Sequence, residues 1–166
     1  MSKAFTREDD QPDPAPAPKP ASPLPPGAKN YVTPDGAKQL KARLDTLVED
    51  ARRAPSEKKK ALNERIHELT RALESAVVVP PPSGDVDVVR FGATVSVRTL
   101  PDGDTVRYRI VGVDETDVAR GWISWVSPIA KALLAAGVGD RVRAVLPSGE
   151  RELEILDIVY ESAGPS

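Results

Sequence analysis

The sequence predicts an α+β protein in which a helical hairpin precedes a small antiparallel sheet with one helix. Apolar residues recur at heptad spacing within residues 31–79, which is typical of helices packed along a narrow seam. Apolar and polar residues alternate within residues 85–162, which indicates half-buried strands. A proline-rich stretch at 80–84 separates the two regions. Helices and strands that are segregated along the chain favour the α+β class.

Composition narrows the functional classes. The 166 residues include 23 basic and 25 acidic side chains, so a net charge of -2 argues against coating nucleic acid by charge alone. The absence of cysteine excludes disulfides and thiolate metal sites, and the single histidine, His67, argues against a zinc site or a Ser-His-Asp triad. No apolar run approaches the roughly 20 residues of a membrane span, and the first residues lack the apolar segment of a secretory signal. We expect a cytoplasmic protein without membrane association.

Residues 1–30 are expected to be a disordered tail, because they hold eight of the 17 prolines in alternation with alanine. Such a segment cannot build a core and favours an extended polyproline conformation. Recognition by a proline-binding groove is the alternative, and only composition supports it.

Residues 31–79 predict an antiparallel coiled-coil hairpin. Thr33 can cap a helix with Pro34 at its first position, where a missing N–H costs nothing. Pro55 and Ser56 interrupt the apolar pattern, and proline is poorly tolerated inside a helix. Each helix has about 20 residues and is therefore roughly 30 Å long. The seam positions on the two sides of the break are Ala37, Leu40, Leu44, Leu47, Ala51 and Leu62, Ile66, Leu69, Leu73, Ala76.

The chain then passes through a stiff hinge at 80–84 into a body at 85–162. Residues 91–99 and 105–113 predict a strand hairpin around the turn PDGD at 101–104. A strand follows around Trp122–Val126. A helix is expected from Ser127 as cap to Gly137 as terminator, because Pro128 again stands at the first position. Two further strands flank the Pro147-Ser148-Gly149 turn.

Several motifs in this order resemble the GreA/GreB transcription elongation factors. They are FGATV (91–95), YRIVGVDETD (108–117), IS..SPIAKALL (123–134), GVGD (137–140) and PSGERELEILDIVY (147–160). Upstream, TPDGAKQLKARLDTL (33–47) and LNERIHELTRALESAVVV (62–79) resemble the two halves of the coiled-coil arm of that family. The resemblance covers about 31–161, has a GreB-like character with a short arm, and implies an FKBP-like body.

The resemblance implies binding to bacterial RNA polymerase at the entrance of its secondary channel. In the family, acidic residues of a D-x-S-E-N type motif at the arm tip help to hold Mg²⁺ and stimulate cleavage of backtracked RNA. The docking loop of the family corresponds here to Ile123, Ser124, Trp125, Val126, Ser127 and Pro128. Val126 stands where relatives often carry an acidic or amide residue. Two readings of Trp125 stay open, an exposed interface anchor or a residue that fills the core or lies against the arm.

The arm tip departs from the family pattern. The segment between the arm halves is short, contains no D-x-S-E-N motif and carries a charge of +4 over residues 51–60, from Arg52, Arg53, Glu57, Lys58, Lys59 and Lys60. A basic tip repels Mg²⁺. Glu49 and Asp50 are adjacent, and neighbouring residues on a helix diverge by about 100°, so they chelate one ion poorly.

We therefore expect a non-enzymatic regulator of transcription elongation without catalytic residues, cofactor or metal, monomeric, and in indirect contact at most with RNA or DNA in the elongation complex. One alternative is a working cleavage factor that uses Glu49, Asp50 or Glu57 as ligands. A weaker alternative is a peptidyl-prolyl isomerase, which only the FKBP-like fold suggests. The short arm also resembles Rnk, a truncated relative, although the body motifs are closer to GreA/GreB.

Other charged residues have plainer interpretations. His67 lies off the apolar seam and is expected to be solvated. The basic tip is expected to be a solvated loop or a contact for RNA, nucleotide or an acidic polymerase surface. Asp114, Glu115 and Asp117 resemble an acidic turn of the family, which we interpret as a strand-end turn with orientation contacts and no metal.

Overall fold

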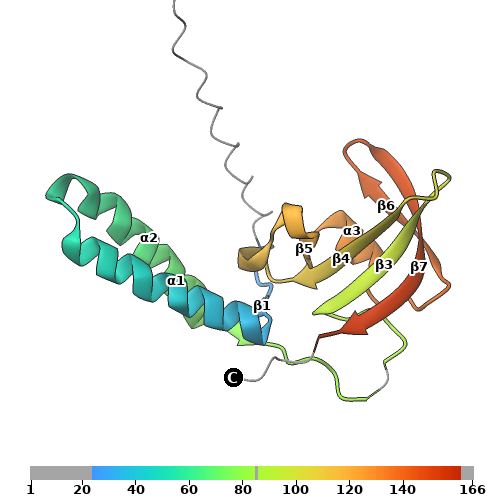
Figure 1. The fold of residues 1–166 in the computed structure, drawn as a ribbon, viewed down its shortest axis with the longest axis horizontal. Helices are drawn as coiled ribbons and strands as arrows, with labels where there is room; N and C mark the ends of the chain where they lie inside the picture. The colour runs from blue at the N-terminus through green and yellow to red at the C-terminus, as the bar shows by residue number, and fades with distance from the viewer. Residues whose placement is uncertain (1–23, 85, 162–166) are drawn as a thin grey trace, which may run out of the picture.

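The computed structural model describes residues 24–84 and 86–161 and confirms the α+β class. Figure 1 shows a pair of long helices that extends away from a body built on a curled sheet. The chain enters this arm through a short strand and leaves it through a second one. No helix within the described ranges has both the length and the apolar character to cross a membrane.

The arm consists of α1 (Pro34–Arg53) and α2 (Ser56–Ser75), joined at Ala54 and Pro55. Thr33 caps α1 as predicted, because its hydroxyl accepts a hydrogen bond from the Gly36 N–H at 3.0 Å. Leu40 is buried near the arm base, whereas the other predicted seam leucines are half-buried. The two helices thus bury one narrow stripe against each other and expose the rest.

Two three-residue strands at the arm base were not predicted. β1 (Asn30–Val32) pairs in parallel with β2 (Ala76–Val78). The Asn30 amide also donates to the Ala72 carbonyl at 3.1 Å, which ties β1 to the end of α2. Most of the predicted tail 1–30 lies outside the described residues, but Asn30 already belongs to β1. Ala76, predicted as a seam residue, begins β2.

The sheet of the body has the strand order β5-β4-β3-β7-β6. Its strands are β3 (Ala93–Leu100), β4 (Thr105–Val111), β5 (Trp122–Ser124), β6 (Arg141–Leu146) and β7 (Gly149–Tyr160). The prediction of an antiparallel sheet was wrong for β5, which pairs in parallel with β4. Two 3₁₀ turns, η1 (Val113–Glu115) and η2 (Val118–Arg120), carry the chain back so that β5 runs in the same direction as β4.

The core lies between one face of this sheet and α3 (Pro128–Leu133). Val95 and Val97 from β3, Ile110 from β4 and Ile155 from β7 are fully buried, as strand alternation requires. α3 ends earlier than the predicted Gly137. Ala135 adopts a positive φ of 69°, and the Ala135 N–H and Ala136 carbonyl bond to Val89 instead of continuing the helix.

The end of β7 fastens the start of the body. The Tyr160 phenol donates a hydrogen bond to the Val88 carbonyl and accepts one from the Arg90 N–H at 2.9 Å. Burial raises the pKa of Tyr160 above its ordinary value, although the Arg90 hydrogen bond and charge oppose that shift. The chain that follows the 80–84 stretch is thereby held at the C-terminal end of β7.

Candidate functional site

The arm tip gathers the predicted basic residues at the end of the arm that lies farthest from the body (Figure 1). Arg52 and Arg53 form the last turn of α1, and Lys58, Lys59 and Lys60 follow the start of α2. All five side chains, and that of Glu57, are exposed. Arg52 pairs with Glu49 at 2.9 Å, and it is the only one of the five with an ion pair in the part of the chain that the structure describes.

The tip does not fit Mg²⁺. This cation prefers several oxygen ligands in near-octahedral geometry. The Glu49 carboxylate is engaged by Arg52, and Glu57 is surrounded by cations along the sequence. Within residues 24–84 and 86–161, no three acidic or histidine side chains gather in a metal-binding group.

The predicted docking segment is mostly a packing element of the body. Ser124 and Val126 are buried, and the Ser124 hydroxyl accepts from the Val126 N–H at 3.2 Å. Ser127 caps α3 as predicted, because its hydroxyl accepts from the Ala130 N–H at 3.3 Å. Pro128 is exposed and Ile123 is half-buried. A partner that binds this segment would therefore contact Pro128 and the exposed parts of residues such as Ile123, but not the Val126 side chain.

Trp125 lies against the base of the arm. Its ring meets that of Tyr31, just before α1, edge to face at a centroid distance of 5.2 Å, and it packs on the body core. The indole N–H is buried without a hydrogen-bond partner among the described residues. Of the two readings of Trp125, the structure supports the packed residue over the exposed anchor.

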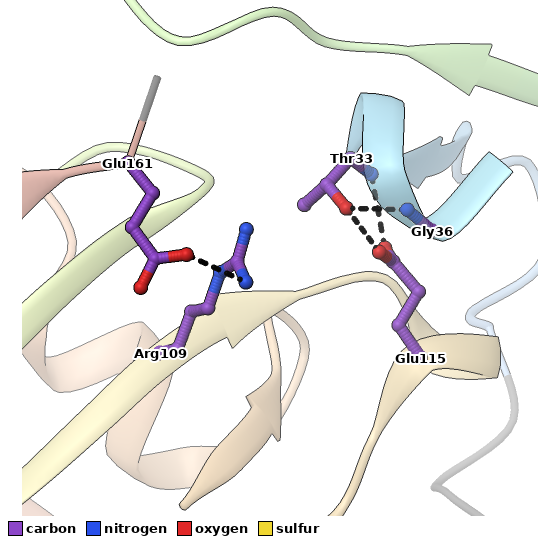
Figure 2. Close-up of polar contacts among 5 residues, drawn as sticks. All are labelled: Thr33, Gly36, Arg109, Glu115 and Glu161. Carbon is purple, nitrogen blue, oxygen red and sulfur yellow. Dashed lines mark hydrogen bonds and ion pairs between the residues drawn. The ribbon is translucent and has the colours of Figure 1, made fainter. Parts of the chain in front are cut away.

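Glu115 in η1 links the body to the first turn of the arm (Figure 2). Its carboxylate accepts hydrogen bonds from the Thr33 N–H at 3.0 Å, from the Thr33 hydroxyl, and from the Gly112 N–H at 2.8 Å. Gly36 makes room for it, because a Cβ at that position would lie 1.7 Å from a Glu115 carboxylate oxygen. We call the group Thr33, Gly36, Gly112 and Glu115 the Glu115 latch.

A groove of about 610 Å³ opens beside this latch, between α1 and the two 3₁₀ turns. Trp122 lines it, and two guanidinium groups lie over its ring, those of Arg109 at 5.0 Å and Arg120 at 5.1 Å from the ring centroid. Figure 2 shows the second partner of Arg109, the Glu161 carboxylate at 3.2 Å.

The sequence predicted the turn that carries Asp114, Glu115 and Asp117, but it predicted neither the latch nor the groove. Thr33 and Glu115 are 82 positions apart, and no local pattern connects them. A glycine within the first turn of a capped helix, Gly36, was the only available hint of a close approach. His67, as predicted, is exposed on α2.

Comparison with known proteins shows to which family the chain belongs. Residues 83–160 match the family described as "Transcription elongation factor, GreA/GreB, C-term". The chain is 38% identical over 162 residues to transcription elongation factor GreB of Xanthomonas axonopodis pv. citri, covering 83% of this chain and 96% of that protein. It is 37% identical over 155 residues to GreB of Neisseria meningitidis serogroup B, covering 80% and 94% of the two chains. A solved structure, the prokaryotic transcription elongation factor GreA/GreB from Nitrosomonas europaea, is 26% identical with a TM-score of 0.42, covering 80% of this chain and 100% of that one. The chain belongs to the GreA/GreB family of transcription elongation factors.

Proposed function

We propose that this protein is an elongation regulator that binds bacterial RNA polymerase at the secondary-channel entrance and does not itself stimulate transcript cleavage. The relatives that match nearly their whole length are named as elongation factors, which supports the general role. In this proposal α1 and α2 correspond to the coiled-coil arm of the family, and the sheet with α3 corresponds to its FKBP-like body.

The observation that carries the proposal is the chemistry of the arm tip. Cleavage stimulation of the family type needs carboxylates there, because Mg²⁺ takes oxygen ligands. This tip instead presents five exposed cations, and the nearby Glu49 carboxylate is paired with Arg52. A cationic surface raises the free energy of a bound Mg²⁺ and supplies no ligand to it.

The length of the arm supports the same conclusion. The match to the Xanthomonas protein runs over 162 residues, whereas 83% of this 166-residue chain is about 138 residues. About 24 residues of that relative therefore have no counterpart here. Since α1 and α2 have 20 residues each, the arm is about 30 Å long at 1.5 Å per residue. We infer that the missing residues belong to the arm, which then ends short of the position that a longer arm reaches.

Docking is assigned to the body, at the segment Ile123–Pro128. Pro128 is its exposed residue, and the groove lined by Trp122 lies next to it along the chain. The backbone of this surface is held by β5 and by the capped start of α3. Preorganised surfaces lose less conformational entropy on binding.

The test is a competition on backtracked elongation complexes. A full-length Gre factor cleaves the RNA while this protein is titrated in, and this protein alone serves as the control lane. We expect inhibition of the other factor and no cleavage in the control lane. Cleavage in that lane would overturn the proposal and direct attention to Glu49, Asp50 and Glu57.

A variant pair locates the docking surface. Pro128→Asp places a charge on the exposed first residue of α3, where an acidic side chain suits the helix dipole and spares the fold. Pro147→Asp makes the same change at the exposed turn between β6 and β7. We expect the first variant to lose competition at least tenfold and the second to compete normally. Equal competition by both variants contradicts docking at this segment.

A further inference from the structure

We propose that the free edge of β6 binds an acidic, extended segment of a partner protein, which adds to the sheet as a sixth strand. β6 ends the strand order β5-β4-β3-β7-β6, and within the described ranges its backbone makes no hydrogen bond beyond its ladder with β7. An edge strand presents unpaired N–H and C=O groups to any chain that can pair with them. The inference is independent of the proposed function.

The register shows which backbone groups of β6 are free. The Ile155 N–H donates to the Asp140 carbonyl at 2.9 Å, and bonded and non-bonded residues alternate along an antiparallel pair. Counted from Asp140, the even-numbered residues of β6 bond to β7. The odd-numbered residues, Arg141, Arg143 and Val145, direct their N–H and C=O groups to the edge, and all three residues are exposed.

Several devices that block an edge strand are missing from β6. Its six residues include no proline, and their register with β7 runs without a bulge. α3 packs on the inner face of the sheet, where Ala144 is buried, and leaves the outer face of β6 exposed. Figure 1 shows β6 on the side of the body that is turned away from the arm. A further strand therefore finds this edge open.

Two arginines set the chemistry of the strand that fits. Arg141 and Arg143 lie opposite Glu154 and Glu152 of β7, yet neither arginine forms an ion pair in the part of the chain that the structure describes. Glu154 pairs with Arg98 of β3 instead, at 3.7 Å. Both guanidinium groups are therefore available to carboxylates on the other side of β6.

The same arginines disfavour a second copy of this chain as the occupant. If two β6 edges paired, Arg143 of one copy would lie opposite or diagonal to arginines of the other, and like charges on facing strands destabilise a sheet. An acidic strand gains free energy where a second copy loses it. The strand that fits best runs antiparallel to β6, with carboxylates opposite Arg141 and Arg143 and an apolar residue opposite Val145, which is 66% exposed.

The position of this edge leaves the docking segment free. β5, which begins that segment, lies at the opposite edge of the sheet from β6. A strand added to β6 therefore does not cover Ile123–Pro128. Through the β6 edge the protein brings an acidic partner to whatever the docking segment binds.

The probe for the test is the peptide TVVEVET, blocked at both ends and added to the ¹⁵N-labelled full chain. Its two glutamates lie on one face of a strand about 7 Å apart, which is also the spacing of Arg141 and Arg143. The peptide TVVKVKT reverses the charge. A version of TVVEVET that is N-methylated at its second, fourth and sixth residues lacks the main-chain donors. An oligothymidylate of equal charge replaces the strand by a phosphate chain.

We expect TVVEVET to shift the amide signals of Arg141, Arg143 and Val145. At about 90% occupancy these amides should exchange with solvent about tenfold more slowly, because only their N–H groups face the edge. The amides of the residues between them should change little. The lysine peptide, the methylated peptide and the oligothymidylate should give no such protection.

Two variants with equal charge changes locate the site. Arg141→Thr/Arg143→Thr removes both cations and keeps residues that favour a strand. Arg90→Thr/Arg107→Thr makes the same change at two exposed arginines elsewhere on the body. We expect the first variant to bind TVVEVET about fivefold more weakly, as the loss of two cross-strand charge pairs implies, and the second to bind it normally.

Four results would overturn the proposal. They are the absence of amide protection at millimolar TVVEVET, equal protection by the lysine or the methylated peptide, equal shifts with the oligothymidylate, and an equal loss of affinity in the two variants. The competition on elongation complexes tests the opposite edge of the sheet, so failure of either proposal leaves the other intact.

Discussion

The Glu115 latch predicts that Gly36→Ala destabilises the wild-type protein but stabilises the Glu115→Ala variant, although alanine favours a helix over glycine in both. Gly36 lies in the first turn of α1, and the three atoms nearest to a Cβ placed there all belong to Glu115, at 1.7, 2.1 and 2.7 Å. Gly36→Ala must therefore expel the carboxylate from the latch. Removal of the same carboxylate by Glu115→Ala takes away the obstacle as well.

The magnitudes follow from the hydrogen bonds. Glu115→Ala leaves the Thr33 and Gly112 N–H groups without their acceptor, and both residues are buried. A buried donor left unpaired costs about 1–3 kcal/mol, so we expect a loss of about 2–4 kcal/mol. Gly36→Ala should cost about 1 kcal/mol less than this, because alanine is the better helix former by about that amount.

In the Glu115→Ala background the Gly36→Ala substitution should reverse its sign and stabilise the protein by up to about 1 kcal/mol. The coupling free energy between the two positions is then about 2–4 kcal/mol, well above the additivity error of about 0.5 kcal/mol for independent sites.

Urea denaturation of the four proteins, followed by circular dichroism at 222 nm, measures this cycle. Asp114→Ala, a change at the exposed acid next to Glu115, is the control and should alter stability by less than about 0.5 kcal/mol. Equal destabilisation by Gly36→Ala in both backgrounds would refute the reasoning.

Three further predictions concern the fold. Tyr160→Phe removes two hydrogen bonds and should cost about 1 kcal/mol. Because the folded-state pKa of Tyr160 is raised, its contribution to stability is present below the unfolded pKa of about 10 and is lost as pH rises above it, so a pH series of urea midpoints should converge for wild type and variant at high pH. Ala135→Gly should raise stability by up to about 1 kcal/mol, since a positive φ of 69° strains alanine; a lower melting temperature would contradict this. Leu40→Ala should cost about 2–5 kcal/mol because Leu40 is 4% exposed, while Leu44→Ala, at a half-buried site, should cost clearly less in the same denaturation assay.

The elements with strong local signals could be predicted from the sequence. Thr33-Pro34 set the start of α1, and Pro55 set the break between the helices, because capping and a missing N–H act within one turn. The alternation that places Val95 and Val97 in the core is likewise local.

Features that depend on distant partners could not be predicted. β1 and β2 have three residues each and pair across 46 positions, as Asn30 does with Ala76, so neither strand carries a signal of its own. The end of α3 is set by Val89, far upstream, and the direction of β5 by the path of η1 and η2. The positive charge of residues 51–60 could be read from the sequence, but only the structure shows how the arm that carries them extends away from the body.

The parallel pairing of β1 with β2 fixes the base of the arm, so that any rotation at the base is amplified along the length of the two helices. Both strands that lead into and out of the helices are bonded to each other, and the Thr33–Glu115 contacts fix the first turn to the body. With an arm of about 30 Å, a rotation of 10° at the base moves the tip by about 5 Å, which is more than the length of a hydrogen bond. The few hydrogen bonds at the base of the arm therefore set the position of the basic side chains at its tip. Loosening these bonds should move the tip relative to the body without changing the side chains that the tip presents.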